Sequence, residues 1–268
     1  MSQNIVESFN IKEAFLYDKT YLFIKGYATA LRLNQTLRAL PLVRRFHNGQ
    51  YRKGEVIIDG TPWKLPYVLH VLKVCSTLIS LRLPFHADEL DNLLAAALLH
   101  DTLEDCKDYF PKGGSELIDE YHFSAQVLET IKLVSKRSGA TSEELDEYFN
   151  AIKRNKYALL IKLADRSHNV EDLYVMKPEK LHKYVNETRT WIYPLTTYGK
   201  ANYPELSDGL TILKAKIVSL TECTETIINI YEDELKKERE ENAKLKAEIE
   251  RLSESLKHKK QRLKLAKK

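Results

Sequence analysis

One short stretch of the sequence gathers four groups that can bind a metal ion or move protons. His100 and Asp101 follow an apolar run, and Glu104 and Asp105 come one helical turn later. Adjacent side chains on a helix are about 100° apart, which is close enough to hold one ion if other ligands arrive from elsewhere. The two later acids then place carboxylates beside that ion. Metal-dependent chemistry is therefore one interpretation of this stretch.

A structural role is the alternative. His100 can interact with the negative end of a helix dipole, and Asp101 or Asp105 can cap the segment that follows. However, burying an imidazole and three carboxylates at the end of an apolar helix is costly unless a cation or polar partners offset their desolvation. The rest of the chain must supply those partners.

Three apolar helices are predicted to bring the partners together. Apolar residues at spacings of three and four predict a buried helix ahead of His100. They are Leu90, Leu93, Leu94, Ala97 and Leu98. A second helix begins near Pro66 or Tyr67, since proline suits a first turn, and it carries His70. A third, over residues 157–164, is apolar almost all round and ends at Asp165.

These helices deliver two imidazoles and two carboxylates, from His70, His100, Asp101 and Asp165. Such a donor set suits Mn²⁺, Fe²⁺, Mg²⁺ or Zn²⁺, and the lack of cysteine ligands argues against structural zinc. Several cationic or amide side chains flank the same helices. They are Arg52, Lys53, Lys162, Arg166 and Asn169. Cations beside a metal favour an anionic substrate that carries phosphate.

Composition predicts an all-α protein. The chain has 268 residues, 43% of them hydrophobic, but only nine glycines and eight prolines, and it shows few alternating apolar and polar runs. Further helices are expected over 116–135, 178–195 and 210–231, and a loop over 48–66 with a short extended piece at 56–58. No signal-like start or membrane-length apolar run is present, so we expect a cytoplasmic protein without a membrane partner. The three cysteines form no CxxC pair and are expected to be reduced.

The C-terminal part carries a heptad repeat. Apolar residues recur every seven positions from Ile228, with Asn242 at an a-type position, where a buried amide favours a parallel dimer. We therefore expect a coiled coil and a homodimer, with a single solvated helix as the alternative. Residues 232–268 hold thirteen basic and nine acidic side chains, so the charge before them is balanced. A balanced domain gives little reason to expect nucleic-acid binding.

Five ordered motifs resemble the HD-domain hydrolases of the RelA/SpoT family, and specifically the small single-domain alarmone hydrolases. They are HNGQYRKG at 47–54, PYVLH at 66–70, HDTLED at 100–105, IKLADRSHN at 161–169, and Glu187-Thr188 before Tyr193-Pro194-Leu195. The resemblance implies an HD-domain helical bundle followed by a coiled-coil helix. The expected parts are an N-terminal helical extension over 1–26, the phosphohydrolase domain over 27–230, and the coiled-coil helix with its basic tail over 231–268.

The resemblance also implies an activity and a role for each matching residue. The family cleaves the 3′-pyrophosphate of (p)ppGpp, yielding GDP or GTP and pyrophosphate, usually with Mn²⁺. The matching metal ligands are His70, His100, Asp101 and Asp165. Glu104 and Asp105 match the acids that position or activate the attacking water. Residues that bind the nucleotide are matched by Arg52, Lys53, Lys162 and Asn169.

Some assignments stay open on the sequence alone. Residues 55–65 are longer than the corresponding family segment, which could reshape the base pocket and change the substrate to another nucleotide such as NADPH or a dNTP. Arg166 either contacts substrate or forms a structural ion pair, and His168 either supports a metal ligand or fills the core. Thr188 and Tyr193 either line the pocket or pack. A catalytically silent alarmone-binding module is a further alternative, although such a module has no physical need for both Glu104 and Asp105.

Overall fold

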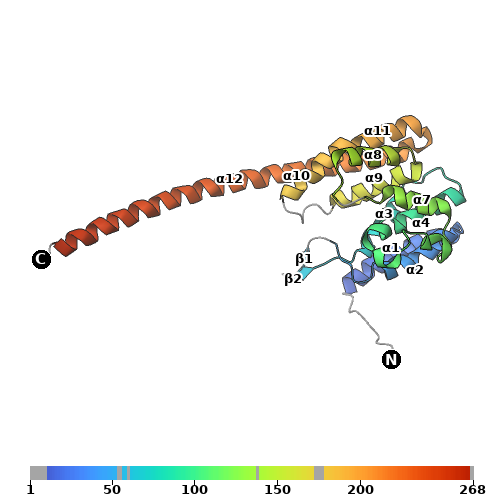
Figure 1. Ribbon diagram of the computed structural model, residues 1–268, viewed down its shortest axis with the longest axis horizontal. Helices are drawn as coiled ribbons and strands as arrows, with labels where there is room; N and C mark the ends of the chain where they lie inside the picture. The colour runs from blue at the N-terminus through green and yellow to red at the C-terminus, as the bar shows by residue number, and fades with distance from the viewer. Residues whose placement is uncertain (1–10, 53–55, 59–60, 137–138, 172–177, 266–268) are drawn as a thin grey trace, which may run out of the picture. The chain divides into compact units, whose positions relative to one another are not determined.

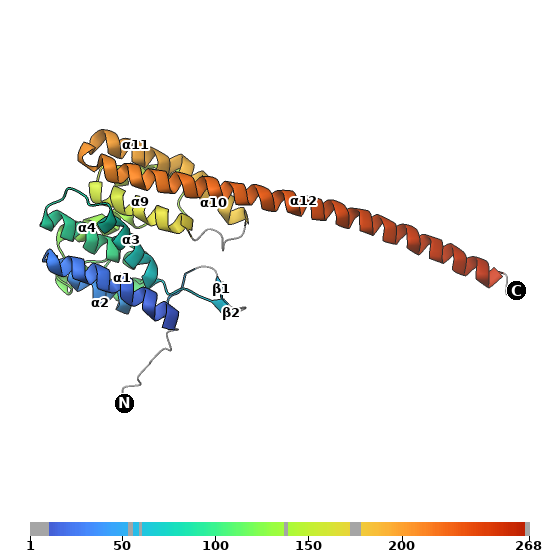
Figure 2. The same ribbon diagram turned by 180° about the vertical axis from the view of Figure 1, so that it is seen from behind.

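The computed structural model describes residues 11–52, 56–58, 61–136, 139–171 and 178–265. The chain divides into two compact units, Met1–Glu222 and Cys223–Lys268. Three helices form the centre of the first unit: α3 (Val68–Ser80), α4 (Ala87–Leu99) and α9 (Lys156–Glu171). In Figures 1 and 2, α3 and α4 lie between the pair α1 (Ile11–Ala30) and α2 (Asn34–Phe46) on one side and α9 on the other.

The remaining elements of the described chain complete the first unit or extend from it. They are α5 (Thr102–Asp105), η1 (Lys107–Tyr109), α6 (Glu116–Asp119), α7 (Ala125–Val134), α8 (Ser142–Lys153), α10 (Pro178–Glu187), the π-helical segment η3 (Thr188–Ile192), α11 (Tyr193–Asn202), η4 (Pro204–Leu206) and α12 (Ser207–Leu265). The predicted helical fold is confirmed.

The helix ahead of His100 is more deeply buried than its predicted stripe. All five stripe residues lie in the core, and Ala95, Ala96 and Leu99 are also inaccessible to solvent. Because residues 93–99 of α4 are buried all round, the polar groups at its C-terminal end emerge inside the protein. The predicted helices carrying His70 and Asp165 are α3 and α9, and both pack against α4. The three sources of candidate ligands are thus direct neighbours.

The N-terminus of α2 shows how α4 is fixed against its neighbour. Leu33 at the cap position provides no side-chain acceptor. Instead, the Asp91 carboxylate of α4 accepts the backbone N–H groups of Gln35 and Thr36, at 2.9 and 2.7 Å. A capping interaction of this kind contributes about 1 kcal/mol and here also joins two helices.

The extended piece expected at 56–58 is strand β1 (Val56–Ile58), which pairs antiparallel with β2 (Thr61–Trp63). Figure 2 shows this hairpin projecting from the helical unit. Backbone hydrogen bonds close its base, from Arg52 N–H to the Leu65 carbonyl at 2.8 Å and from Tyr67 N–H to the Gln50 carbonyl at 2.9 Å. The hairpin therefore leaves and rejoins the domain at one point.

Two of the expected helices are interrupted. The helix predicted over 116–135 is α6 followed by α7, because His122 adopts a left-handed φ of 56°. The helix predicted over 178–195 changes to π geometry in η3 before α11 begins at Tyr193. The chain between the helices predicted over 178–195 and 210–231 was expected to be a loop, but α11 continues to Asn202 and α12 starts at Ser207.

Helix α12 contributes Leu210, Leu213 and Ile217 to the core of the first unit. The second unit, taken by itself, is the later part of this helix and presents exposed apolar side chains at heptad positions. They are Tyr231, Leu235, Leu245, Ile249, Leu252 and Leu256, each at least 42% exposed. Within the described part of the chain, none of the helices has both the length and the apolar character needed to cross a membrane.

Candidate metal centre and adjoining cavity

Four side-chain atoms from α3, the end of α4 and α9 converge on one point. His100 Nε2 lies 3.0 Å from Asp101 Oδ2 and 4.0 Å from Asp165 Oδ1. His70 Nε2 lies 3.5 and 3.2 Å from the same two oxygens. Donors about 2.0–2.2 Å from a shared ion are separated by roughly 3–4.4 Å, so these spacings fit a single divalent cation.

Local hydrogen bonding turns the His100 imidazole toward this point. Its Nδ1 lies 2.8 Å from the Ala97 carbonyl, to which it donates, so the proton is on Nδ1 and the lone pair of the neutral ring is on Nε2. The buried Nε2 makes no hydrogen bond of acceptable geometry, despite its closeness to Asp101. An orphaned buried nitrogen aimed at two carboxylates is the arrangement expected of a metal ligand.

His70 is oriented by a second histidine. Its Nδ1 lies 2.8 Å from His168 Nδ1, so one ring donates and the other accepts. Burial, with further contributions from the neighbouring His70 and Arg52, lowers the pKa of His168 to about 2, which keeps His168 neutral. With His168 accepting, His70 carries its proton on Nδ1 and presents the Nε2 lone pair to the cluster. This geometry favours the supporting role for His168.

The two carboxylates have their own polar partners. Tyr67 donates its hydroxyl hydrogen to Asp101 Oδ2 at 2.6 Å. Lys162 Nζ lies 3.2 Å from Asp165 Oδ2, and the Asn169 side-chain amide donates to Asp165 Oδ1. Each carboxylate thus keeps an oxygen directed at the imidazoles while a second group fixes its orientation.

The charges in the cluster are strongly perturbed. Burial opposes ionisation of Asp101, but His100 and His70 outweigh it and hold the pKa of this carboxyl well below its usual range. Burial likewise opposes ionisation of Asp165, whose pKa is nevertheless lowered by Lys162 and His70. Burial also disfavours protonation of His100, yet Asp101 and Asp165 raise its pKa to about 9. Without a metal, a proton on His100 therefore balances part of the negative charge.

A cavity of about 600 Å³ opens beside this cluster. Its lining combines the carboxylates of the candidate centre with cations, amides and tyrosines. The lining residues are Gln50, Tyr51, Arg52, Tyr67, Asp101, Glu104, Asp105, Lys136, Lys162, Asp165, Arg166, Asn169, Tyr184 and Glu187. The size falls within the range of small-molecule sites. Of the sequence-predicted substrate contacts, Arg52, Lys162 and Asn169 line it, whereas Lys53 lies outside the described residues.

Both candidate acids line the cavity, but their surroundings differ. The Glu104 carboxylate accepts a hydrogen bond from the backbone N–H of Lys136, and burial raises the pKa of Glu104. Asp105 is exposed on the cavity side of α5, and its backbone carbonyl accepts a 2.8 Å hydrogen bond from the Gln50 side chain. Glu104 is therefore partly shielded from solvent, whereas Asp105 is open to water.

The position of Arg166 favours the structural interpretation. Arg166 is 3% exposed. Its guanidinium pairs with Glu187, and the guanidinium carbon lies 4.3 Å from the centroid of the Tyr184 ring. Glu187 also lies 3.5 Å from Lys136 Nζ. Arg166 thus links α9 to Glu187 of α10. Glu187 in turn contacts Lys136, whose backbone N–H donates to the Glu104 carboxylate.

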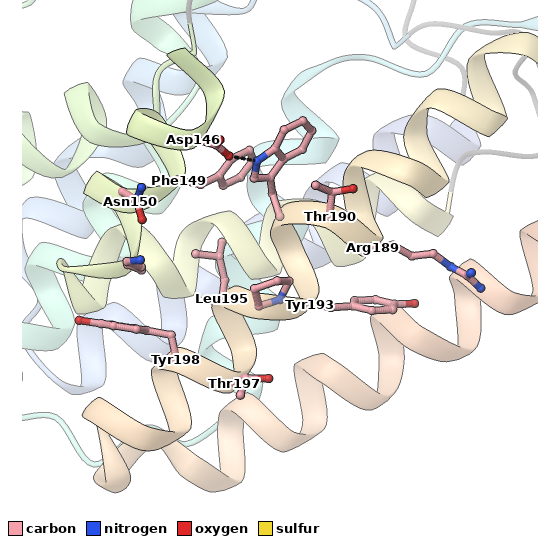
Figure 3. Close-up of a pocket in the computed structure, with 12 residues that line it drawn as sticks. Asp146, Phe149, Asn150, Arg189, Thr190, Tyr193, Leu195, Thr197 and Tyr198 are labelled. Carbon is pink, nitrogen blue, oxygen red and sulfur yellow. Dashed lines mark hydrogen bonds between the residues drawn. The ribbon is translucent and has the colours of Figure 1, made fainter. Parts of the chain in front are cut away.

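A second cavity of about 650 Å³ is lined by residues of α8, η3 and α11 (Figure 3). Trp191 stacks on Phe149 with ring centroids 5.6 Å apart, and its indole N–H donates to Asp146 at 2.7 Å. Tyr193 lines this second cavity, not the one beside the candidate metal centre. Thr188 is buried, and its hydroxyl donates to the Tyr184 carbonyl at 2.7 Å. Packing is therefore the better interpretation of Thr188.

Sequence reasoning did not single out Gln50, Tyr67 or Lys136 as site residues. Gln50 and Tyr67 lie within two of the motifs, so their proximity to predicted ligands was a usable signal. Lys136 contacts the site through its backbone N–H and a salt bridge to Glu187. Neither contact leaves a pattern in the sequence.

No family model matches the chain. A guanosine-3′,5′-bis(diphosphate) 3′-pyrophosphohydrolase from Vibrio cholerae is 30% identical over 190 residues, covering 68% of this chain and 24% of that protein. The chain belongs to the RelA/SpoT family. A second relative in this family, the bifunctional (p)ppGpp synthase/hydrolase SpoT of Escherichia coli K12, is 28% identical over 189 residues, with the same two coverages of 68% and 24%.

The chain spans about a quarter of the length of these curated RelA/SpoT relatives. A solved structure described as a metazoan ortholog of SpoT that hydrolyses ppGpp aligns with a TM-score of 0.48 and 22% identity, over 70% of this chain and 94% of that one. Family membership agrees with the predicted HD-domain bundle, and the long helix α12 follows that bundle as expected.

Proposed function

We propose that this domain hydrolyses the 3′-pyrophosphate of (p)ppGpp in a metal-dependent reaction that yields GDP or GTP and pyrophosphate. One observation supports the proposal: four nitrogen and oxygen atoms that could bind a metal ion converge at the wall of a cavity that also holds two further acids and several cations. The relatives named as (p)ppGpp pyrophosphohydrolases indicate which phosphate ester fits such a site.

The proposed metal ligands are His70, His100, Asp101 and Asp165. The two imidazoles have their Nδ1 atoms engaged and their Nε2 atoms directed inward, and the donors are nitrogen and oxygen, which suits Mn²⁺. When bound, a divalent cation lowers the pKa of water and polarises a phosphate oxygen. Lys162, buried beside Asp165, adds positive charge where a pyrophosphate is bound.

Glu104 and Asp105 are the proposed acid and base. A water molecule attacks the phosphorus attached to the ribose 3′ oxygen, and one of these carboxylates accepts its proton. The bond between that phosphorus and the 3′ oxygen breaks, and the 3′ oxygen takes up a proton. Burial raises the pKa of Glu104, which favours it for the role of acid, while the exposed Asp105 suits the role of base.

Arg52, Lys162 and Asn169 are the proposed substrate contacts in the described cavity, and Lys53 remains a proposal from the motif alone. The Arg52 guanidinium donates to the Asn169 side-chain oxygen at 2.8 Å, so the two residues form one wall. A planar guanidinium can stack on a purine base and pair with phosphate oxygens.

A nucleotide panel tests this assignment. Purified protein with Mn²⁺ is incubated separately with ppGpp, pppGpp, NADPH and the four dNTPs, and release of pyrophosphate and phosphate is followed. We expect rapid pyrophosphate release from ppGpp or pppGpp. Turnover of NADPH or a dNTP without turnover of ppGpp would show that the enzyme hydrolyses another nucleotide. Metal binding without any turnover would favour a silent binding module.

We further propose that the second unit forms a parallel coiled coil with a second copy of the chain. Its exposed heptad side chains, Leu235, Leu245, Ile249, Leu252 and Leu256, repeat in one register, and Asn242 occupies an a-type position. An unpartnered stripe of this kind would leave a large apolar surface in water. Pairing of two copies would bury it.

A further inference from the structure

Tyr67 lies where the wall that holds Arg52 meets the candidate metal centre. It precedes α3, and its hydroxyl donates to Asp101 Oδ2 at 2.6 Å. The same oxygen lies 3.0 Å from His100 Nε2 and 3.5 Å from His70 Nε2. The hydroxyl therefore restrains the one Asp101 oxygen that faces both imidazoles.

The ring of Tyr67 makes further contacts, one of them edge-on to the His70 ring with centroids 5.5 Å apart. It stacks on His47, with centroids 5.0 Å apart and an interplanar angle of 28°. The guanidinium carbon of Arg52 lies 5.8 Å from the centroid of the Tyr67 ring. A cation near an aromatic face gains about 0.5–2 kcal/mol. The ring thus helps to set the position of Arg52, which also donates to the Asn169 side chain.

We propose that Tyr67 is a positioning residue with two separable functions: its hydroxyl fixes the metal ligand Asp101, and its ring fixes the substrate-binding Arg52. The second function rests on the proposed hydrolysis of (p)ppGpp, whereas the first requires only metal binding.

The hydroxyl has a physical reason to matter. The Asp101 side chain is 17% exposed, so without its donor one carboxylate oxygen can turn toward water. Groups that hydrogen-bond to metal ligands in this way typically contribute 10- to 100-fold to metal affinity. The ring contacts both His70 and Arg52, so KM for ppGpp at saturating Mn²⁺ is the readout that reports its contact with Arg52.

Two substitutions separate the functions. Tyr67→Phe removes the hydroxyl and keeps the ring, and we expect Mn²⁺ affinity to fall about 10- to 100-fold by titration calorimetry. At saturating Mn²⁺, its KM for ppGpp should stay within about twofold of the wild-type value, since the π face is retained. Tyr67→Leu removes both groups and should also raise that KM about three- to tenfold, from the loss of a cation–π contact.

Tyr203→Phe is the matched control, because its hydroxyl donates to the Lys153 carbonyl at 3.2 Å, away from the cluster. It should change neither Mn²⁺ affinity nor KM. Wild-type Mn²⁺ affinity in Tyr67→Phe would overturn the role of the hydroxyl, and equal KM values in Tyr67→Phe and Tyr67→Leu would overturn the role of the ring. If the wild-type protein does not hydrolyse ppGpp, the proposed function fails, but the calorimetry still tests the hydroxyl.

Discussion

Protons and the metal ion compete for His100, and the surroundings of His100 determine how strongly metal affinity depends on pH. A metal ligand must be the neutral imidazole, whereas the field of Asp101 and Asp165 raises the pKa of His100 to about 9. At pH 7 the metal-free site is therefore protonated at His100, and binding of the metal expels that proton. The difference of about two units between pH 7 and the pKa of His100 corresponds to about 100-fold in metal affinity, or about 2.7 kcal/mol.

The expected sign is a Mn²⁺ affinity that rises with pH, by about tenfold per unit between pH 6.5 and 8.5. Titration calorimetry in two buffers of different ionisation enthalpy should also show release of about one proton per ion at pH 7. Asp101→Asn removes a charge that holds the His100 proton, so it should weaken binding at high pH and flatten the pH dependence. A wild-type affinity that does not change with pH, together with no proton release, would refute this reasoning.

Three further predictions follow from other parts of the structure. Asp105→Asn should leave Mn²⁺ affinity nearly unchanged and lower kcat by about 10²- to 10⁴-fold, whereas Asp165→Ala should abolish Mn²⁺ binding. Equal loss of Mn²⁺ binding in the two variants, measured by calorimetry, would contradict the assigned roles. Replacing residues 55–64 with two glycines should shift the melting temperature by only a few degrees, because backbone hydrogen bonds close the base of the hairpin. The same replacement should change the ratio of kcat/KM for ppGpp to kcat/KM for NADPH. An unchanged ratio would exclude the hairpin from substrate selection. Truncation after Tyr231 should convert a dimer into a monomer by sedimentation velocity, and an unchanged mass would count against the coiled coil.

Much of the candidate centre could be predicted because its residues end strongly apolar helices. The stripe before His100 and the apolar run before Asp165 are local patterns, and local patterns report which helices are buried. The convergence of their ends depends on packing, yet three buried helices in one small domain have few ways to avoid contact. The resemblance of the ordered motifs supplied the remaining information.

The interruptions in the helices could not be predicted in the same way. The left-handed φ of His122 separates α6 from α7, although nothing in the residue type requires it. The change to π geometry in η3 accompanies the pairing of Glu187 with Arg166, which lies on another helix. Tertiary contacts of this kind override the local periodicity.

The roles of Arg166 and Tyr67 show the same limit within the site. Arg166 was compatible with substrate contact or an ion pair until its partner Glu187, 21 residues away, was located. The donation from Tyr67 to Asp101 spans 34 residues and belongs to no local pattern. Polar partners far apart in sequence become visible only when the chain is folded.

Hydrolysis of ppGpp in ¹⁸O-labelled water tests the central claim most directly. With Mn²⁺ present, we expect equal amounts of GDP and pyrophosphate, with one ¹⁸O atom in the pyrophosphate and none in the GDP, measured by mass spectrometry. This result places the attack on the phosphorus attached to the 3′ oxygen. Label in the GDP, or release of single phosphates without pyrophosphate, would contradict the proposed reaction.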